Sequence, residues 1–215
     1  MKRFCLKATI VAMGLGLAAV ANAESSYVTG AATASPGAVA RVDFTIVIPK
    51  ILYLRVGAGS PYWPANSTLA SLGTVDLITF QPTAAVLGNG TAVAATAGSG
   101  DLTNGAVTAA IVSNSGNVTL IATASGAMGN GVGDSINYSH ITTTAAALNY
   151  ATALPAPTLT NAASASVVLT APVSKVIKQD ARWTYAYANT TLPPAGTYGG
   201  VNVNNGRITY TATMP

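Results

Sequence analysis

The chain has 215 residues, of which 50% are hydrophobic and only 7% are charged, and its formal net charge is +4. Soluble domains usually carry about a quarter charged residues, so Thr, Ser, Asn and backbone groups must supply the polar surface. Lys2, Arg3 and Lys7 account for three of the ten basic residues. The rest of the chain is close to neutral, which excludes the basic surface that binds nucleic acid or anionic lipid.

The first 23 residues have the pattern of a secretory signal peptide. Lys2 and Arg3 precede an apolar run over residues 8–20, and Ala21-Asn22-Ala23 is a small-residue cleavage site. The run is too short for a membrane span, which needs about 20 apolar residues. We expect export by the general secretory route to the periplasm, the cell surface or the medium. Because Cys5, the single cysteine, lies in this peptide, the exported chain would have no disulfide. We also expect no membrane span in the exported chain.

Residues 24–38 are small and polar and alternate only weakly, so they predict a flexible arm or a poor first strand. The stretch that follows, RVDFTIVIPKILYLRV over residues 41–56, has period-two alternation. Its even positions are apolar except Lys50, which follows Pro49. Such alternation turns one face of a strand toward a core, and proline is confined to strand ends, edges and bulges. We therefore predict two consecutive strands, at about 40–48 and 51–57.

The odd face of this stretch also carries apolar groups, at Val47, Ile51 and Tyr53. In a monomer these side chains would have to lie under loops such as 57–73. In an assembly they could form the contact between copies.

The remainder of the chain consists of short strand patterns separated by turns rich in Gly, Asn and Pro. Residues 106–112 and 117–123 flank a compact turn and predict a hairpin. A short helix fits at 144–150, but Pro155 and Pro157 exclude a long one. Further strands are predicted at 75–80, 135–144, 164–170, 181–188 and 207–213. About nine or ten short strands with almost no helix predict an all-β fold, a single immunoglobulin-like Greek-key β-sandwich over residues 39–215.

No residue pattern indicates catalysis, a cofactor or a metal. His140 is the single histidine, whereas a triad needs an oriented base and a zinc site needs several His or Cys ligands. The six carboxylates form no local pair of the kind that glycosidases use. The glycine-rich run 129–134 supplies one carboxylate, too few for calcium, and a strand pattern follows it, so we interpret it as a plain turn. We expect a protein that is not an enzyme.

Two aromatic groups are the candidates for ligand or partner contact. Tyr62 and Trp63 stand between prolines in a loop, where they could contact a sugar or a protein; the alternative is that Trp63 plugs the end of the sandwich. Trp183, Tyr185 and Tyr187 share one strand face. They could form a flat sugar-binding platform or the heaviest part of the core, and the pattern favours the core.

The C-terminal segment resembles a known family. Pro194-Ala195-Gly196-Thr197-Tyr198 followed by the terminal strand RITYTATMP resembles the closing segment of spore-coat-U-like, archaic chaperone-usher fimbrial subunits. The opening VDFTIVIPKILYLRVG is similar to exported bacterial sandwich proteins. The resemblance implies an incomplete immunoglobulin-like sandwich that polymerises through a donated strand, with a periplasmic chaperone and an outer-membrane usher as partners.

The sequence thus leaves three functional hypotheses. The first is a structural protein, a pilin-like or extracellular-matrix subunit that acts by self-association. The alternative is a secreted adhesin that binds glycans through its exposed aromatics. The third is a hydrolase with a dispersed carboxylate pair, for which the sequence offers the least support.

Overall fold

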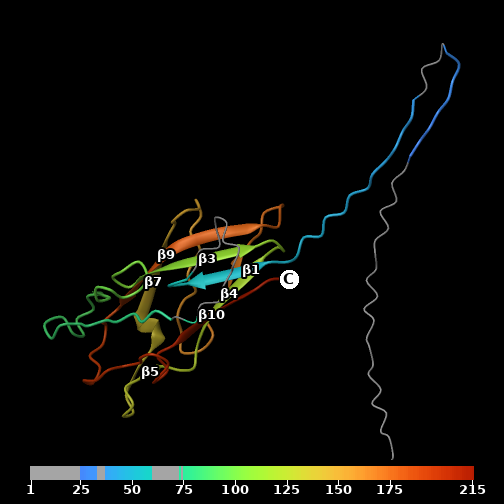
Figure 1. Ribbon diagram of the computed structural model, residues 1–215. Helices are drawn as coiled ribbons and strands as arrows, with labels where there is room; N and C mark the ends of the chain where they lie inside the picture. Colours follow the sequence, from blue (N-terminus) through green and yellow to red (C-terminus); the bar gives the residue numbers. More distant parts are fainter. Residues whose placement is uncertain (1–24, 33–36, 60–72, 74) are drawn as a thin grey trace, which may run out of the picture. The chain divides into compact units, whose positions relative to one another are not determined.

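The computed structural model describes residues 25–32, 37–59, 73 and 75–215. The chain divides into two units, residues 1–48 and 49–215. The second unit contains every strand found among the described residues (Figure 1). The strands are β1 (Leu52–Val56), β2 (Val93–Ala94), β3 (Ala106–Ser113), β4 (Val118–Ala124), β5 (Met128–Gly129), β6 (Ser135–Ile136), β7 (Ile141–Ala146), β8 (Val167–Leu169), β9 (Ile177–Tyr187) and β10 (Ile208–Thr213).

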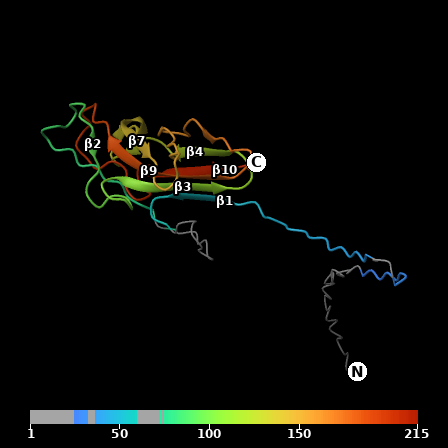
Figure 2. The same ribbon diagram turned by 90° about the horizontal axis from the view of Figure 1, so that it is seen from above.

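The larger sheet is built around β9. Strand β3 pairs with residues 177–184 of β9 and β2 continues along the same edge, whereas β7 pairs with residues 182–187 along the opposite edge. Strand β1 pairs with the outer edge of β3. The second sheet has the order β10-β4-β8, and every pair in both sheets is antiparallel. Figure 2 shows β1 and β3 in one layer and β4 and β10 in another.

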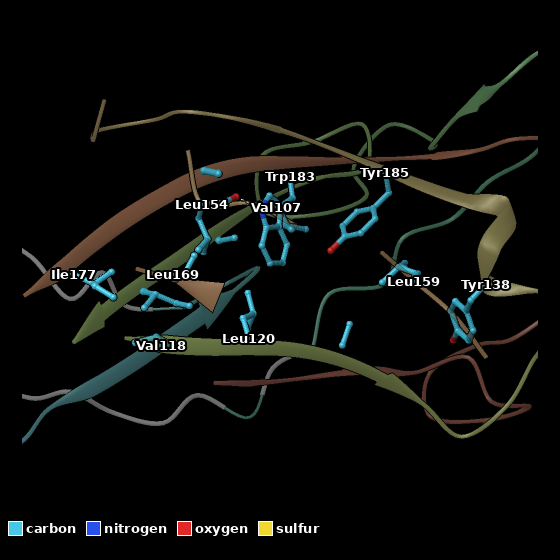
Figure 3. Close-up of a cluster of buried hydrophobic side chains, with 14 of the residues drawn as sticks. Val107, Val118, Leu120, Tyr138, Leu154, Leu159, Leu169, Ile177, Trp183 and Tyr185 are labelled. Carbon is cyan, nitrogen blue, oxygen red and sulfur yellow. Dashed lines mark hydrogen bonds between the residues drawn. The ribbon is translucent and has the colours of Figure 1, made fainter. Parts of the chain in front are cut away.

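The core lies between these two sheets. Trp183 and Tyr185 project from β9 toward Val118 and Leu120 on β4, with Leu154 filling the space beside them (Figure 3). The Trp183 side chain is fully buried, and its indole Nε1 donates a hydrogen bond to the Leu154 carbonyl at 2.8 Å. A buried indole usually finds such a partner, so one hydrogen bond positions the largest side chain of the core.

The predicted all-β fold is confirmed. The described residues contain no α-helix, and the one helical element is a short 3₁₀ turn, Tyr138–His140. The short helix considered at 144–150 does not form; β7 occupies its first residues. Predicted strands that form within a few residues of their expected positions are those at 51–57, 106–112, 117–123, 164–170, 181–188 and 207–213.

The predicted hairpin of 106–112 with 117–123 is wrong, although both strands exist. Strand β3 pairs with β1 and β9, whereas β4 pairs with β10 and β8. The turn between them, which contains Gly116 at φ +100°, therefore carries the chain from one sheet to the other. A turn pattern shows that a chain reverses direction, but two strands whose apolar faces both need burial can pack face to face instead of pairing.

Three other predicted strands differ from the structure. The strand predicted at 135–144 is divided into β6 and β7 by the 3₁₀ turn Tyr138–His140. Residues 75–80 form no strand and make a single bridge, from Phe80 to Ala95. Residues 40–48 contain no strand, and the unit that holds the sheets spans Pro49–Pro215. The described residues of the 24–38 arm also carry no strand. The predicted signal peptide, 1–23, lies outside the described residues.

Candidate functional site

The two aromatic groups have different outcomes. Trp183, Tyr185 and Tyr187 are at most 7% exposed, so in the folded unit none of them offers a ring face to a sugar. They form part of the core, as the alternation favoured. Tyr62 and Trp63 lie outside the described residues.

Several titratable side chains are tied into the fold. His140 is half-buried in the 3₁₀ turn, where its Nδ1 lies 3.2 Å from the Thr190 hydroxyl. The described residues hold no group of three His, Cys, Asp or Glu side chains that could bind a metal ion. Four carboxylates accept hydrogen bonds that fix loops: Asp76 from the Ala58 amide, Asp101 from the Thr108 amide and Arg55, Asp134 from Asn130, and Asp180 from Asn149 and the Tyr150 amide.

The glycine-rich run at 129–134 is the tip of a small hairpin. Strands β5 and β6 pair directly on either side of it. The Asn130 side chain accepts hydrogen bonds from the Val132 and Asp134 amides and donates one to the Asp134 carboxylate at 2.8 Å. This network satisfies the loop internally, which agrees with the interpretation as a plain turn.

Tyrosine hydroxyls crosslink the core. The Tyr185 and Tyr210 hydroxyls lie 2.9 Å apart and join the two sheets, and the Tyr138 hydroxyl donates to the Asn205 carbonyl at 2.6 Å. Burial raises the pKa of Tyr138 to about 12 and that of Tyr210 to about 12, and it raises the pKa of Tyr185 well above the ordinary value. All three phenols therefore stay protonated in the folded state at pH values where an exposed phenol ionises.

These shifts predict alkaline instability. An unfolded tyrosine ionises near pH 10, so between about pH 10 and 12 the unfolded state releases protons that the folded state keeps. The contribution of these three phenols to the free energy of unfolding should be constant below about pH 10 and fall as the pH rises toward 12. Denaturant unfolding across this range measures the fall, and Tyr138→Phe should make it shallower. A free energy of unfolding that stays flat to pH 12 would contradict the assignment.

The most unusual surface in the described residues is a run of exposed apolar side chains that we call the apolar arm, residues 41–48. On its even face, Phe44 and Ile46 are 87% and 84% exposed, and Val42 and Ile48 are also exposed. Single exposed apolar residues are ordinary, but a contiguous group marks an interaction site. The arm has the alternation of a half-buried strand, but no strand is assigned over its residues.

Strands β10 and β1 each have an outer edge that no described strand covers. On β10, the inward-facing side chains Ile208, Tyr210 and Ala212 pack against the core but stay partly exposed, and they alternate with exposed threonines. On β1, Leu52 and Leu54 also contact the core and remain half-buried. Among the described residues, no strand or bridge pairs with the outer edge of either strand.

The beginning of β1 is held firmly. The side-chain oxygen of Asn114 accepts a hydrogen bond from the Ile51 N–H, and its side-chain nitrogen donates one to the Pro49 carbonyl, both at 2.8 Å. These bonds continue the β1–β3 contact through a side chain after β3 has ended, and they hold Pro49 and Ile51 beside Asn114. The Lys50 ammonium donates to the Pro215 carbonyl at 2.9 Å, which ties this point to the C-terminus.

One open hollow of about 300 Å³ lies beside β9, with Tyr150, Pro172, Val176 and Lys178 among its lining residues. Tyr150 is the one aromatic side chain that lines it. The hollow therefore lacks the several ring faces on which sugars usually stack, and we assign no ligand to it.

Comparisons with protein-family models, with curated protein sequences and with solved structures found no match to this chain. Within the described residues, no helix is both long and apolar enough to span a membrane.

Proposed function

We propose that this protein is an exported, non-enzymatic structural subunit, pilin-like or part of an extracellular matrix, that acts by associating with copies of itself. The observation that carries the proposal is the apolar arm, whose even face exposes four large apolar side chains. A chain with so few charges would hold such a face in water at a substantial cost. Burial against another molecule removes that cost.

The size of the effect is in the range that association needs. Full burial of one Val, Ile or Phe side chain contributes about 1.5–3 kcal/mol, so the four residues of the even face together contribute roughly 6–12 kcal/mol. Association costs about 4–15 kcal/mol in lost translational and rotational freedom. Because the two terms are of similar size, the equilibrium should depend visibly on concentration.

The proposal predicts that the purified protein forms oligomers or fibres as its concentration rises. Size-exclusion chromatography with light scattering, followed by electron microscopy of the largest species, measures this directly. Raising the salt concentration should leave association intact, because apolar contacts are not screened. A protein that stays monomeric up to millimolar concentration would contradict the proposed function.

A further inference from the structure

We propose that Asn130 is a site of spontaneous covalent modification, at which the side-chain amide is lost as ammonia and a carboxylate takes its place. The inference does not depend on self-association. It follows from the hydrogen bonds at the tip of the β5–β6 hairpin, which gather the groups that this reaction needs around one Asn-Gly pair.

The chain contains four Asn-Gly pairs, at residues 89–90, 104–105, 130–131 and 205–206. An asparagine that precedes glycine is prone to this reaction, because glycine has no side chain to shield its own backbone nitrogen. That nitrogen attacks the Cγ atom of the asparagine side chain, and the five-membered ring that forms is a succinimide. The sequence ranks the four pairs equally, whereas the structure separates them.

Three of the four glycine nitrogens have an N–H that is already hydrogen-bonded. Each donates to a backbone carbonyl at 2.8 Å: Gly90 to Asn189, Gly105 to Ser99 and Gly206 to Val203. The nitrogen must lose this proton when it attacks, so each of these bonds has to break first. In the described parts of the chain the Gly131 N–H has no such partner, and Gly131 is exposed to the water that accepts its proton.

The side-chain oxygen of Asn130 is held in a reactive arrangement. Its Oδ1 accepts hydrogen bonds from the Val132 and Asp134 amides at 3.0 and 3.1 Å. The bond to Val132 closes a ring of atoms that contains both the Asn130 Cγ and the Gly131 nitrogen, so it keeps the attacking and the attacked atom close together. The two N–H donors also stabilise the negative charge that Oδ1 gains during the attack, as an oxyanion hole does.

Asp134 holds the group that leaves. The Asn130 Nδ2 donates a hydrogen bond to the Asp134 carboxylate at 2.8 Å. A bond forms between the Gly131 nitrogen and Cγ, the Gly131 proton passes to water, and the Cγ–Nδ2 bond breaks once Nδ2 has taken up a proton from water and can leave as ammonia. The carboxylate favours the protonated, positively charged form of Nδ2. Water then opens the succinimide at either carbonyl and gives aspartate or isoaspartate, and no group is oxidised or reduced.

The product lacks the contact that closes the hairpin tip. A carboxylate at residue 130 has no N–H to donate, so two negative charges would face each other where the hydrogen bond to Asp134 stood. Strands β5 and β6 have only two residues each and hold the tip by a short ladder. We therefore expect the modified protein to exchange the Val132 and Asp134 amide hydrogens faster than the unmodified protein.

Peptide mapping by mass spectrometry during prolonged incubation of the full chain measures the reaction at all four pairs. In the folded protein we expect Asn130 to convert at least about tenfold faster than the other three, and to give both aspartate and isoaspartate. In strong denaturant the four rates should become similar. Exposure alone favours the opposite order, because Asn130 is half-buried and the other three asparagines are exposed. If Asn130 converts no faster than the others in the folded protein, or yields aspartate alone, the proposal is overturned.

Asp134→Asn tests the part played by the carboxylate, because it keeps an acceptor for Nδ2 and removes the charge. We expect conversion of Asn130 to slow by about tenfold or more, with the rate at Asn89 in the same sample as the reference. Asp76→Asn is the matched control: this carboxylate also accepts from a loop amide, and its loss should leave the rate at Asn130 unchanged. Equal slowing by both variants, or by neither, would contradict the role of Asp134.

Discussion

Replacing Trp183 by alanine should lower the free energy of unfolding by about 3–5 kcal/mol, a large part of the total stability of a domain of this size. Trp183 is fully buried on β9, and the centroid of its ring lies 5.3 Å from that of the Tyr210 ring in the other sheet. The substitution leaves a cavity between the sheets and also removes the donor to the Leu154 carbonyl. Denaturant unfolding followed by circular dichroism measures the loss.

Two companion variants divide this effect into its parts. Trp183→Phe keeps most of the ring volume but removes the indole N–H, so it should lower the free energy of unfolding less than the alanine variant does. The loss that the phenylalanine variant still shows measures the effect of the unpaired Leu154 carbonyl and of the smaller ring. Arg182→Ala alters the adjacent, exposed residue of the same strand and should change the free energy of unfolding by less than about 0.5 kcal/mol. If Trp183→Ala and Arg182→Ala have similar effects, the central place of Trp183 in the core is wrong.

The same alternation that predicted β9 and β10 correctly also predicted a strand at 40–48, where the described structure has none. Period-two patterning reports that a segment is suited to bury one face. It does not report which edge the segment pairs with, or whether that edge belongs to the same molecule. Residues 41–48 and 208–213 have equally clear alternation, yet only the second segment forms a strand ladder, with β4, in the described structure.

The aromatic candidates and the hairpin show a related limit. The spacing of Trp183, Tyr185 and Tyr187 placed them on one face, but burial depends on what covers that face, and β4 and Leu154 come from distant parts of the chain (Figure 3). The turn between β3 and β4 was located correctly, and its strands were assigned to the wrong partners for the same reason. Local chemistry predicts elements and turns, whereas long-range packing decides pairing.

Asn189 has a structural role that its sequence context, Asn-Thr-Thr in a chain rich in both residue types, does not indicate. Its side chain is fully buried, and its backbone adopts φ +53°. The side-chain oxygen accepts from the Gly88 amide at 2.8 Å, and the side-chain nitrogen donates to the Val86 and Thr91 carbonyls at 2.7 and 3.2 Å. One amide therefore holds the loop over residues 86–91 against the end of β9.

Asn189→Ala should lower the free energy of unfolding by roughly 2–5 kcal/mol. The loss of the side chain leaves backbone groups of the loop without partners, at about 1–3 kcal/mol. Alanine in the left-handed region adds about 1–2 kcal/mol. Denaturant unfolding measures the total, and hydrogen exchange at the Gly88 and Gly90 amides should accelerate if the loop opens locally.

Asn189→Gly and Asn189→Asp separate these causes. Glycine adopts a positive φ freely, so it should be about 1 kcal/mol less destabilising than alanine while losing the same hydrogen bonds. Aspartate keeps the acceptor for Gly88 but turns a second oxygen toward the Val86 and Thr91 carbonyls, so it should be at least as harmful as alanine. If alanine and glycine were equivalent, backbone strain would play no part; if aspartate were tolerated, the nitrogen of Asn189 could not be the donor that closes the loop.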